Sequence, residues 1–138
     1  MTTQHSHKIF VNLPVSDLKR SMDFFSHLGF AFNPQFTDDN AACMVLSEDG
    51  YVMLLRDEFF KTFTKRGISN AGAQTEAIIA LSCESRAEVD EMAQKAIAAG
   101  GTQAMDPVDH CFMYSQSFYD PDNHHWEVLW MDPAAIQS

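Results

Sequence analysis

Alternating apolar and polar residues open the chain, which is the spacing of a β-strand with one buried face. This alternation covers residues 9–13, and the apolar spacing then changes to that of an amphipathic helix over 18–28. Ser16 or Asp17 can cap the helix, and Gly29 ends it. Three short strands are expected to follow, over 30–36, 42–46 and 51–55.

The same order of elements returns in the second half of the chain. A connector at 58–75 starts with a helical turn, and a strand is then expected at 77–82. The next segment predicts a helix that Ser85 caps and Gly100 ends. Short strands are expected after it at 102–104, 112–119 and 125–130.

This repeat predicts an α+β fold of two tandem β-α-β-β-β modules in a single domain, 1–138. Placing Phe10 on Ile78, and Gly50 on Asn123, superimposes the strands of the two halves. Each helix covers one face of its sheet, so two modules side by side form a cup-shaped sheet that suits a small molecule. The expected bounds are about 8–57 for module one, 58–75 for the connector and 76–132 for module two.

Composition and charge exclude some classes of function. The chain is 46% hydrophobic and 20% charged, as in ordinary globular domains, and no apolar run is long enough to cross a membrane. A net charge of −10 argues against nucleic-acid binding, which depends on clustered Lys and Arg. Three widely spaced cysteines, and a start without the pattern of a secretory signal, favour reduced thiols and a cytoplasmic protein.

Two segments resemble the vicinal-oxygen-chelate (VOC) superfamily of glyoxalases, bleomycin-resistance proteins and extradiol dioxygenases. Residues 10–30, FVNLPVSDLKRSMDFFSHLGF, resemble its opening strand, amphipathic helix and Leu-Gly-Phe. Residues 117–130, SFYDPDNHHWEVLW, resemble its closing Asp-Pro-Asp-Gly with Glu four residues later. The resemblance runs from Lys8 to Asp132 and implies the glyoxalase/bleomycin resistance/dioxygenase fold, often as a homodimer. A fold of this kind does not by itself name a reaction.

The resemblance also implies where a divalent metal would bind. In metal-dependent members, the first and last strands of each module supply His, Gln or Glu ligands. The matching positions here are Phe10, Leu54, Ile78 and Glu127, of which only Glu127 carries a donor. We therefore expect no metal site of the usual kind and no cofactor, while a divalent metal held in another way stays open as an alternative.

Strand alternation maps the residues that are expected to line the cup. If Glu127 points inward, so does His125, and Phe10 likewise brings Asn12 with it. The resulting pocket is mainly apolar with a few polar anchors, as in sites for small organic molecules. The predicted ligand-binding residues are Asn12, Arg56, His125, Phe10, Leu54 and Ile78.

Two residues are candidates for proton transfer. Glu127 in apolar surroundings can act as a general acid or base, or its carboxylate is simply paired with Arg56 or His125. His110 lies in a loop before a strand of module two. It can carry protons at the mouth of the cup, or it is bonded to Asp109 or to the backbone.

Two hypotheses of function follow. The chain either binds a small organic molecule in the cup without the usual metal site, or it is an enzyme with an altered site. Such an enzyme would be a lyase, isomerase or dioxygenase that uses Glu127 and a nearby histidine. The expected partners are a small-molecule ligand and a second copy of the chain, with no nucleic acid and no membrane.

Overall fold

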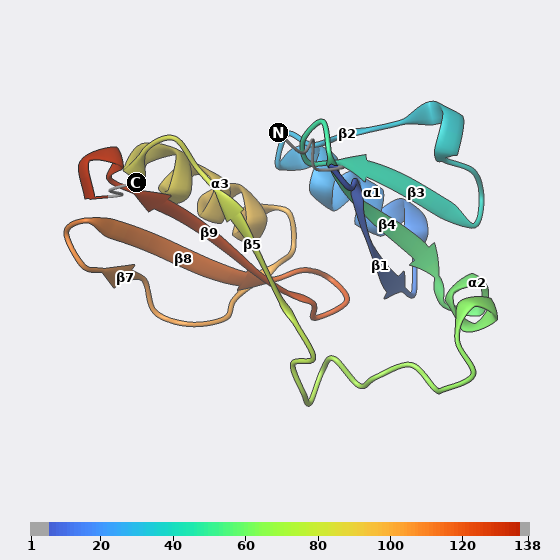
Figure 1. Cartoon of the computed structure of the whole chain (residues 1–138). Helices are drawn as coiled ribbons and strands as arrows, with labels where there is room; N and C mark the ends of the chain where they lie inside the picture. Colours follow the sequence, from blue (N-terminus) through green and yellow to red (C-terminus); the bar gives the residue numbers. More distant parts are fainter. Residues whose placement is uncertain (1–5, 136–138) are drawn as a thin grey trace. The chain divides into compact units, whose positions relative to one another are not determined.

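The computed structural model describes residues 6–135 of the chain. Contacts divide the chain into two compact units, Met1–Ile68 and Ser69–Ser138, so the division falls inside the predicted connector. Each unit holds one sheet and one long helix (Figure 1). The predicted α+β class is confirmed, with the β-α-β-β-β order present in the first unit and, with one additional strand, in the second.

The first unit is a four-stranded sheet with one long helix and three short helical turns. Its elements are β1 (Ile9–Val15), α1 (Leu18–His27), β2 (Ala31–Phe32), η1 (Pro34–Phe36), β3 (Ala41–Val45), β4 (Gly50–Arg56), α2 (Asp57–Phe60) and η2 (Lys61–Phe63). The strand order is β1-β4-β3-β2, with β1 parallel to β4 and the other pairs antiparallel.

The second unit repeats this topology with one additional strand. Its elements are β5 (Ile78–Ser82), α3 (Arg86–Ala98), β6 (Thr102–Gln103), β7 (Val108–Asp109), β8 (Met113–Tyr119), β9 (His125–Met131) and η3 (Pro133–Ala135). The strand order is β5-β9-β8-β6, and β5 is parallel to β9 as β1 is to β4. The additional strand is β7, which pairs with β8.

Capping residues begin and end both long helices where the sequence indicates. The side chains of Asp17 and Ser85 each accept a hydrogen bond at 3.1 Å from the backbone N–H three residues ahead. Gly29 and Gly100 follow the helices with φ angles of 104° and 110°, a left-handed conformation that favours glycine. Local chemistry therefore determines both helix ends in each unit.

Two short elements differ from the sequence prediction. The strand expected at 30–36 ends after two residues, because Pro34 begins a 3-10 turn that the side chain of Asn33 caps by accepting the Gln35 N–H at 2.9 Å. The loop expected around Pro107 contains β7, a strand of only two residues. This strand forms by pairing with β8, and the pattern of its own residues does not indicate it.

Side-chain alternation along β4 decides what α1 covers. Val52 and Leu54 are fully buried at 0% exposure, whereas Tyr51 and Met53 on the opposite face are partly exposed. Since α1 packs on β3 and β4, the face with Leu54 is the helix-covered one. The expected open-face position of Leu54 is therefore corrected to the core of the first unit.

The hairpin loops explain this difference of one residue. Five residues separate the paired Val45 and Tyr51, and five separate the paired Tyr119 and His125. Tyr51 thus corresponds to His125 and Met53 to Glu127, so Gly50 does not correspond to Asn123 as expected. Asn123 has a positive φ angle, 67°, whereas Gly50 begins β4 in an ordinary strand conformation. A shift of one residue moves every side chain of a strand to the other face.

A buried carboxylate organises the hairpin between β8 and β9. Asp120 is 4% exposed and accepts hydrogen bonds from the backbone N–H of Asp122 at 2.9 Å and of His124 at 3.0 Å. Its second oxygen accepts the indole N–H of Trp126 at 3.0 Å. Burial raises the pKa of Asp120, while the positive potential of His124 and these donors favour its charged form. The Asp-Pro-Asp motif is thus a structural turn that anchors the core tryptophan.

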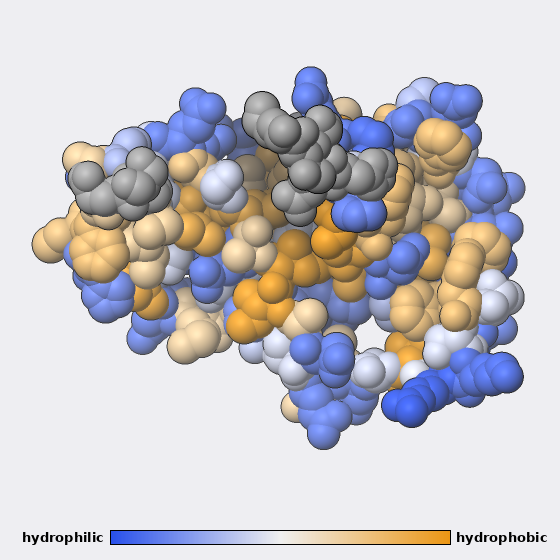
Figure 2. All heavy atoms as spheres, in the orientation of Figure 1, coloured by the Kyte–Doolittle hydropathy of each residue, from blue (hydrophilic) through white to orange (hydrophobic). Residues whose placement is uncertain are grey.

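The core of each unit lies between its helix and sheet. Phe24 and Phe25 of α1 are buried, as are Phe118, Trp126 and Val128 in the second unit. Some apolar side chains remain exposed, and Figure 2 shows orange apolar atoms interrupting the blue polar surface. The exposed large apolar residues are Ile9, Phe10, Phe36, Phe63, Ile78, Ile97, Met105, Phe112 and Met131.

Candidate functional site

The second sheet presents a mixed polar and apolar face on the side opposite α3. The register pairs Glu127 of β9 with Ala80 of β5 and with Ser117 of β8, so these three side chains share that face. The helix α3 packs against the other face, which carries Trp126 and Val128. The side chains on the open face, by register, are Ile78, Ala80, Ser82, Ser115, Ser117, Tyr119, His125, Glu127 and Leu129.

Glu127 is the charged group at the centre of this open face. Its side chain is half-buried, and within residues 69–135 no hydrogen bond or ion pair engages its carboxylate. The paired residue Ser117 uses its Oγ to accept the Met105 N–H at 3.1 Å. The carboxylate of Glu127 therefore keeps its acceptor positions for a ligand or for water.

His125 precedes Glu127 on the same face and is 7% exposed. Its ring meets the ring of Tyr119 edge to face, with centroids 5.3 Å apart and planes inclined at 65°. Such packing fixes the imidazole orientation without using a ring nitrogen. Neighbouring His124 lies in the turn before β9, where its backbone N–H donates to Asp120 at 3.0 Å.

The open face of the first sheet is apolar and aromatic. Phe10 of β1 and Tyr51 of β4 are paired in register and stack with ring centroids 4.9 Å apart and planes inclined at 12°. The Nζ of Lys8 lies 5.8 Å from the Tyr51 ring centroid. Asn12 is exposed on the same face as Phe10, and its Nδ2 donates to the Phe10 carbonyl at 3.4 Å. This face suits a flat or apolar group.

Arg56 lies at the end of β4, where it is exposed. Its side chain donates to Asn40 Oδ1 at 2.7 Å, and its backbone N–H donates to the Asn40 carbonyl at 2.9 Å. Arg56 lies two residues after Leu54, so by strand alternation it belongs to the face of Leu54 and not to the open face. The structure thus gives Arg56 a structural partner in its own unit.

His110 lies in an exposed loop that an arginine anchors to α3. Asp109 receives two hydrogen bonds from Arg86, at 2.7 and 3.0 Å, and this pairing lowers the pKa of Asp109 to about 2. The Arg86 guanidinium also lies over the rings of Tyr114 and Trp130, at 5.0 and 5.3 Å. The ion pair thus joins this loop to α3.

The structure does not bring His110 beside Glu127. The backbone N–H of His110 donates to the Met113 carbonyl at 2.8 Å, whereas Glu127 pairs with Ser117. Met113 and Ser117 are four residues apart on β8, about 13 Å at the rise of a strand. The ring of His110 stacks on Phe112 at a centroid distance of 6.2 Å.

Sequence reasoning missed several open-face residues. The expected open-face position of Leu54 leaves Tyr51 and Met53 on the other face, because Gly50 was matched with Asn123. Ser117 and Tyr119 were not considered, although they alternate with apolar residues on the strand before the Asp-Pro-Asp turn. Equal loop lengths in the two hairpins would have identified Tyr51 and Met53, and alternation along β8 would have identified Ser117 and Tyr119.

Comparison with known families identifies the fold. Residues 9–128 match the family model described as the Glyoxalase/Bleomycin resistance protein/Dioxygenase superfamily. The chain belongs to this superfamily. The resemblance of its first and last motifs to VOC proteins is therefore confirmed.

Several solved structures have the same fold as this chain. A hypothetical protein from S. aureus is 25% identical with a TM-score of 0.78, covering 92% of this chain and 95% of its own. A glyoxalase/bleomycin resistance protein/dioxygenase family enzyme from Burkholderia phytofirmans is 16% identical with a TM-score of 0.73, covering 88% and 96%. The fosfomycin resistance protein FosX from Mesorhizobium loti is 18% identical with a TM-score of 0.64, covering 97% of each chain. A search of curated proteins gave no match.

Members of the VOC superfamily usually bind a divalent metal, and the residues present here do not fit that ion. The matched positions hold Phe10, Ile78 and Glu127, and the hairpin register replaces Leu54 by Met53 at the fourth. Within residues 6–135 no cluster of three or more His, Cys, Asp or Glu side chains is arranged to hold a metal. No described helix is long and apolar enough to span a membrane.

Proposed function

We propose that this VOC protein binds a small, partly apolar organic molecule on its open sheet faces, without the superfamily's usual four-donor metal site. The observation that carries the proposal is Glu127, a half-buried carboxylate with no partner in its own unit. A half-buried carboxylate without a partner lowers the stability of the fold unless a ligand binds to it. The ligand group that suits it is an ammonium, amidinium or hydroxyl donor.

The other predicted residues support this assignment in different ways. His125 lies next to Glu127 on the same face, and Ile78 contributes an exposed apolar side chain on β5. On the first sheet, the Phe10–Tyr51 stack offers an aromatic surface and Asn12 a polar edge. Aromatic and aliphatic walls with few polar anchors are typical of sites for small organic molecules.

The alternative is an enzyme of the lyase, isomerase or dioxygenase type with an altered acid/base site. The observation that favours it is the position of His125 and Glu127 at successive open-face positions of β9. A histidine and a carboxylate side by side can move a proton between substrate atoms. His110 is less suited to this role, because its loop is anchored near Met113.

We also infer that the protein works in the cytoplasm as a homodimer. Edge strands β1 and β5 carry the exposed apolar residues Ile9, Phe10 and Ile78. Exposed edges of this kind are commonly covered by another chain. The net charge of −10 is unsuited to nucleic acid and favours cationic ligands.

Replacing Glu127 by Gln tests the binding proposal. We use phenethylammonium as the probe, because it combines an aromatic ring with a cationic donor, and measure its affinity by isothermal titration. The variant Glu127→Gln should bind about tenfold or more weakly, since a charge-assisted hydrogen bond contributes about 1.5–3 kcal/mol. Its melting temperature should change little, because the carboxylate has no partner in its unit to lose.

The matched control is Glu76→Gln, which removes the same charge from an exposed position outside the sheets. If both variants weakened phenethylammonium binding equally, the effect would come from the net charge of the protein, which would contradict a site at Glu127. A large loss of thermal stability in Glu127→Gln with unchanged binding would assign Glu127 a structural role instead.

A further inference from the structure

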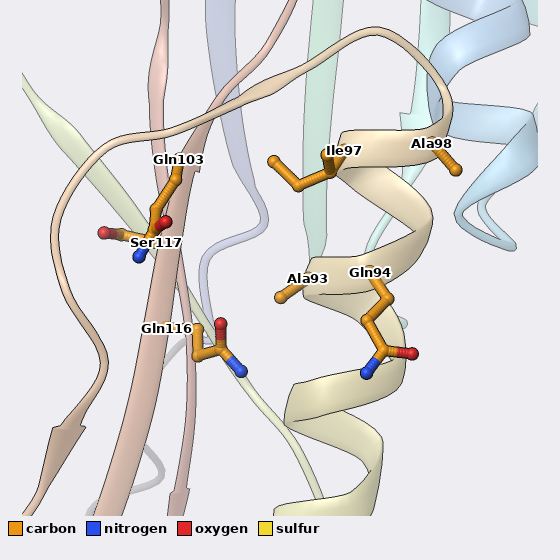
Figure 3. A pocket seen from close by; sticks show the side chains of 7 residues that line it. All are labelled: Ala93, Gln94, Ile97, Ala98, Gln103, Gln116 and Ser117. Carbon is orange, nitrogen blue, oxygen red and sulfur yellow. The ribbon is translucent and has the colours of Figure 1, made fainter.

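A separate cavity of about 370 Å³ lies between α3 and the edge of the second sheet at β6 and β8 (Figure 3). It opens on the helix-covered face, because Gln116 of β8 and Gln103 of β6 pair in register with Val128 and Phe118 of that face. Glu127 projects from the opposite face of the sheet. The cavity is therefore distinct from the site of the proposed function, and it is large enough for a small ligand.

A neighbouring carboxylate fixes the orientation of Gln116. Its Nε2 donates to Asp90 Oδ1 at 2.6 Å, and the hydroxyl of Tyr114 donates to the same oxygen at 2.5 Å. A charged carboxylate only accepts, so the amide nitrogen must face Asp90 and the amide oxygen must face away. Figure 3 shows the Gln116 carboxamide extending from β8 toward α3. Its oxygen accepts no hydrogen bond from the described part of the chain.

Gln103 is oriented in the same way at the other end of the cavity. Its Nε2 donates to the Met105 carbonyl at 3.0 Å, which directs its Oε1 away from that backbone. The Met105 N–H in turn donates to Ser117 Oγ, so this border of the cavity is held at two points. Two amide oxygens thus stay unused as acceptors, while the nitrogen of Gln116 donates to Asp90 and Tyr114 and that of Gln103 donates once, to Met105.

The wall that α3 contributes is apolar, and negative groups lie close to the cavity. Ala93 and Ile97 point from α3 toward the strand, and Ile97 is 49% exposed. Asp90 lies behind Gln116, and the cavity adjoins the last turn of α3, the negative end of the helix dipole. The nearest lysine on this helix, Lys95, is paired with Glu91 at 2.8 Å.

We propose that this cavity is a binding site for a small organic cation with several N–H donors, such as an alkylguanidinium. The N–H groups donate to the oxygens of Gln103 and Gln116, and the alkyl chain packs on Ala93 and Ile97. A planar guanidinium carries five N–H donors and no acceptor, which complements the two unused amide oxygens of this wall. An anion meets one unused donor, the second N–H of Gln103, and it is repelled by the carboxylate of Asp90.

The test is a titration of the full chain with butylguanidinium chloride, followed by amide NMR shifts. Saturable shifts are expected at residues 93–97, 103 and 116, and none with butyrate. Gln103→Glu should tighten binding about three- to tenfold and Gln103→Lys should weaken it as much, the effect of one hydrogen bond or charge. Gln103 is exposed, so both variants should fold.

Gln35→Glu and Gln35→Lys are the matched controls. Gln35 is exposed in the first unit, and its substitutions change the net charge by the same amount as those of Gln103. These two variants should bind as the unchanged chain does. The proposal is overturned if shifts grow without saturation, if butyrate causes the same shifts, or if the Gln35 and Gln103 pairs behave alike. Shifts confined to β9 would place the cation at Glu127 instead.

Discussion

Asp109 and Glu127 are carboxylates of the same unit in opposite situations. Asp109 receives both guanidinium hydrogen bonds from Arg86, and its pKa is lowered to about 2. Glu127 has no partner in its unit and lies on an open sheet face. At the scale of the residue, one carboxylate stabilises the fold and the other is available to a ligand.

The Arg86–Asp109 pair predicts a dependence of stability on pH. The pKa of Asp109 falls from an ordinary 3.8 to about 2 on folding, so between these values the unfolded chain binds more protons. The stabilisation is therefore complete above pH 3.8 and is lost as the pH falls toward 2. We expect Asp109→Asn to lower the melting temperature at neutral pH, and the difference from the unchanged chain to shrink through that window.

Asp106→Asn is the control for this measurement, because Asp106 is an exposed carboxylate in the preceding loop. Its melting curve should follow that of the unchanged chain at every pH. A gap between Asp109→Asn and the unchanged chain that stays constant as the pH falls would show that the ion pair does not carry the effect.

At the scale of the element, β4 has two faces with different roles. Leu54 is fully buried on the face that α1 covers, and Met53 is half-buried on the face that carries the Phe10–Tyr51 stack. The hairpin register decides between these faces. Because both hairpin loops have five residues, Met53 of the first unit occupies the position that Glu127 occupies in the second. The consequence is measurable in the energetics of single side chains.

Truncation of the two side chains tests the register. Leu54→Ala should reduce the free energy of unfolding by about 2–5 kcal/mol, because it leaves a cavity in a filled core. Met53→Ala should cost about 1 kcal/mol, in proportion to its smaller buried area. Chemical denaturation measures both values. A larger loss for Met53→Ala than for Leu54→Ala would mean that the strand faces are reversed.

At the scale of the whole molecule, the chain keeps the VOC topology but not the donors of its usual metal site. Both units have the parallel pairing of first and last strands, β1 with β4 and β5 with β9. Of the positions that supply ligands, only Glu127 holds a donor that binds hard divalent ions. A carboxylate alone does not complete the coordination of such an ion.

Metal content is therefore a direct test at this scale. The purified chain should contain well under one equivalent of Zn, Ni, Mn or Fe by elemental analysis, before and after incubation with each ion. Chelator should leave the melting temperature unchanged, because no described side chains form a metal cluster whose loss would destabilise the fold. One equivalent of metal that Glu127→Gln abolishes would instead support the enzyme with an altered site.

The sequence by itself determined the features that depend on near neighbours along the chain. Asp17 and Ser85 begin the helices, and Gly29 and Gly100 follow them, because capping and left-handed backbone are local chemistry. The repeated order of strands and helix followed from the same local periodicity, and the resemblance of the first and last motifs indicated the superfamily. The open-face positions of His125 and Glu127 followed from alternation within one strand.

Tertiary structure decided the features that join distant residues. The two faces of β4 depend on its pairing with β3, because a register is a property of two strands together. Alternation along β4 alone therefore predicted Leu54 on the open face, where the structure has Met53. The ion pair of Arg86 with Asp109 joins α3 to β7 across 23 residues. The side chains of Gln103 and Gln116 line the α3 cavity, and Met105 and Asp90 hold their amide nitrogens. Such contacts exist only once the sheet has formed and the helix has packed on it.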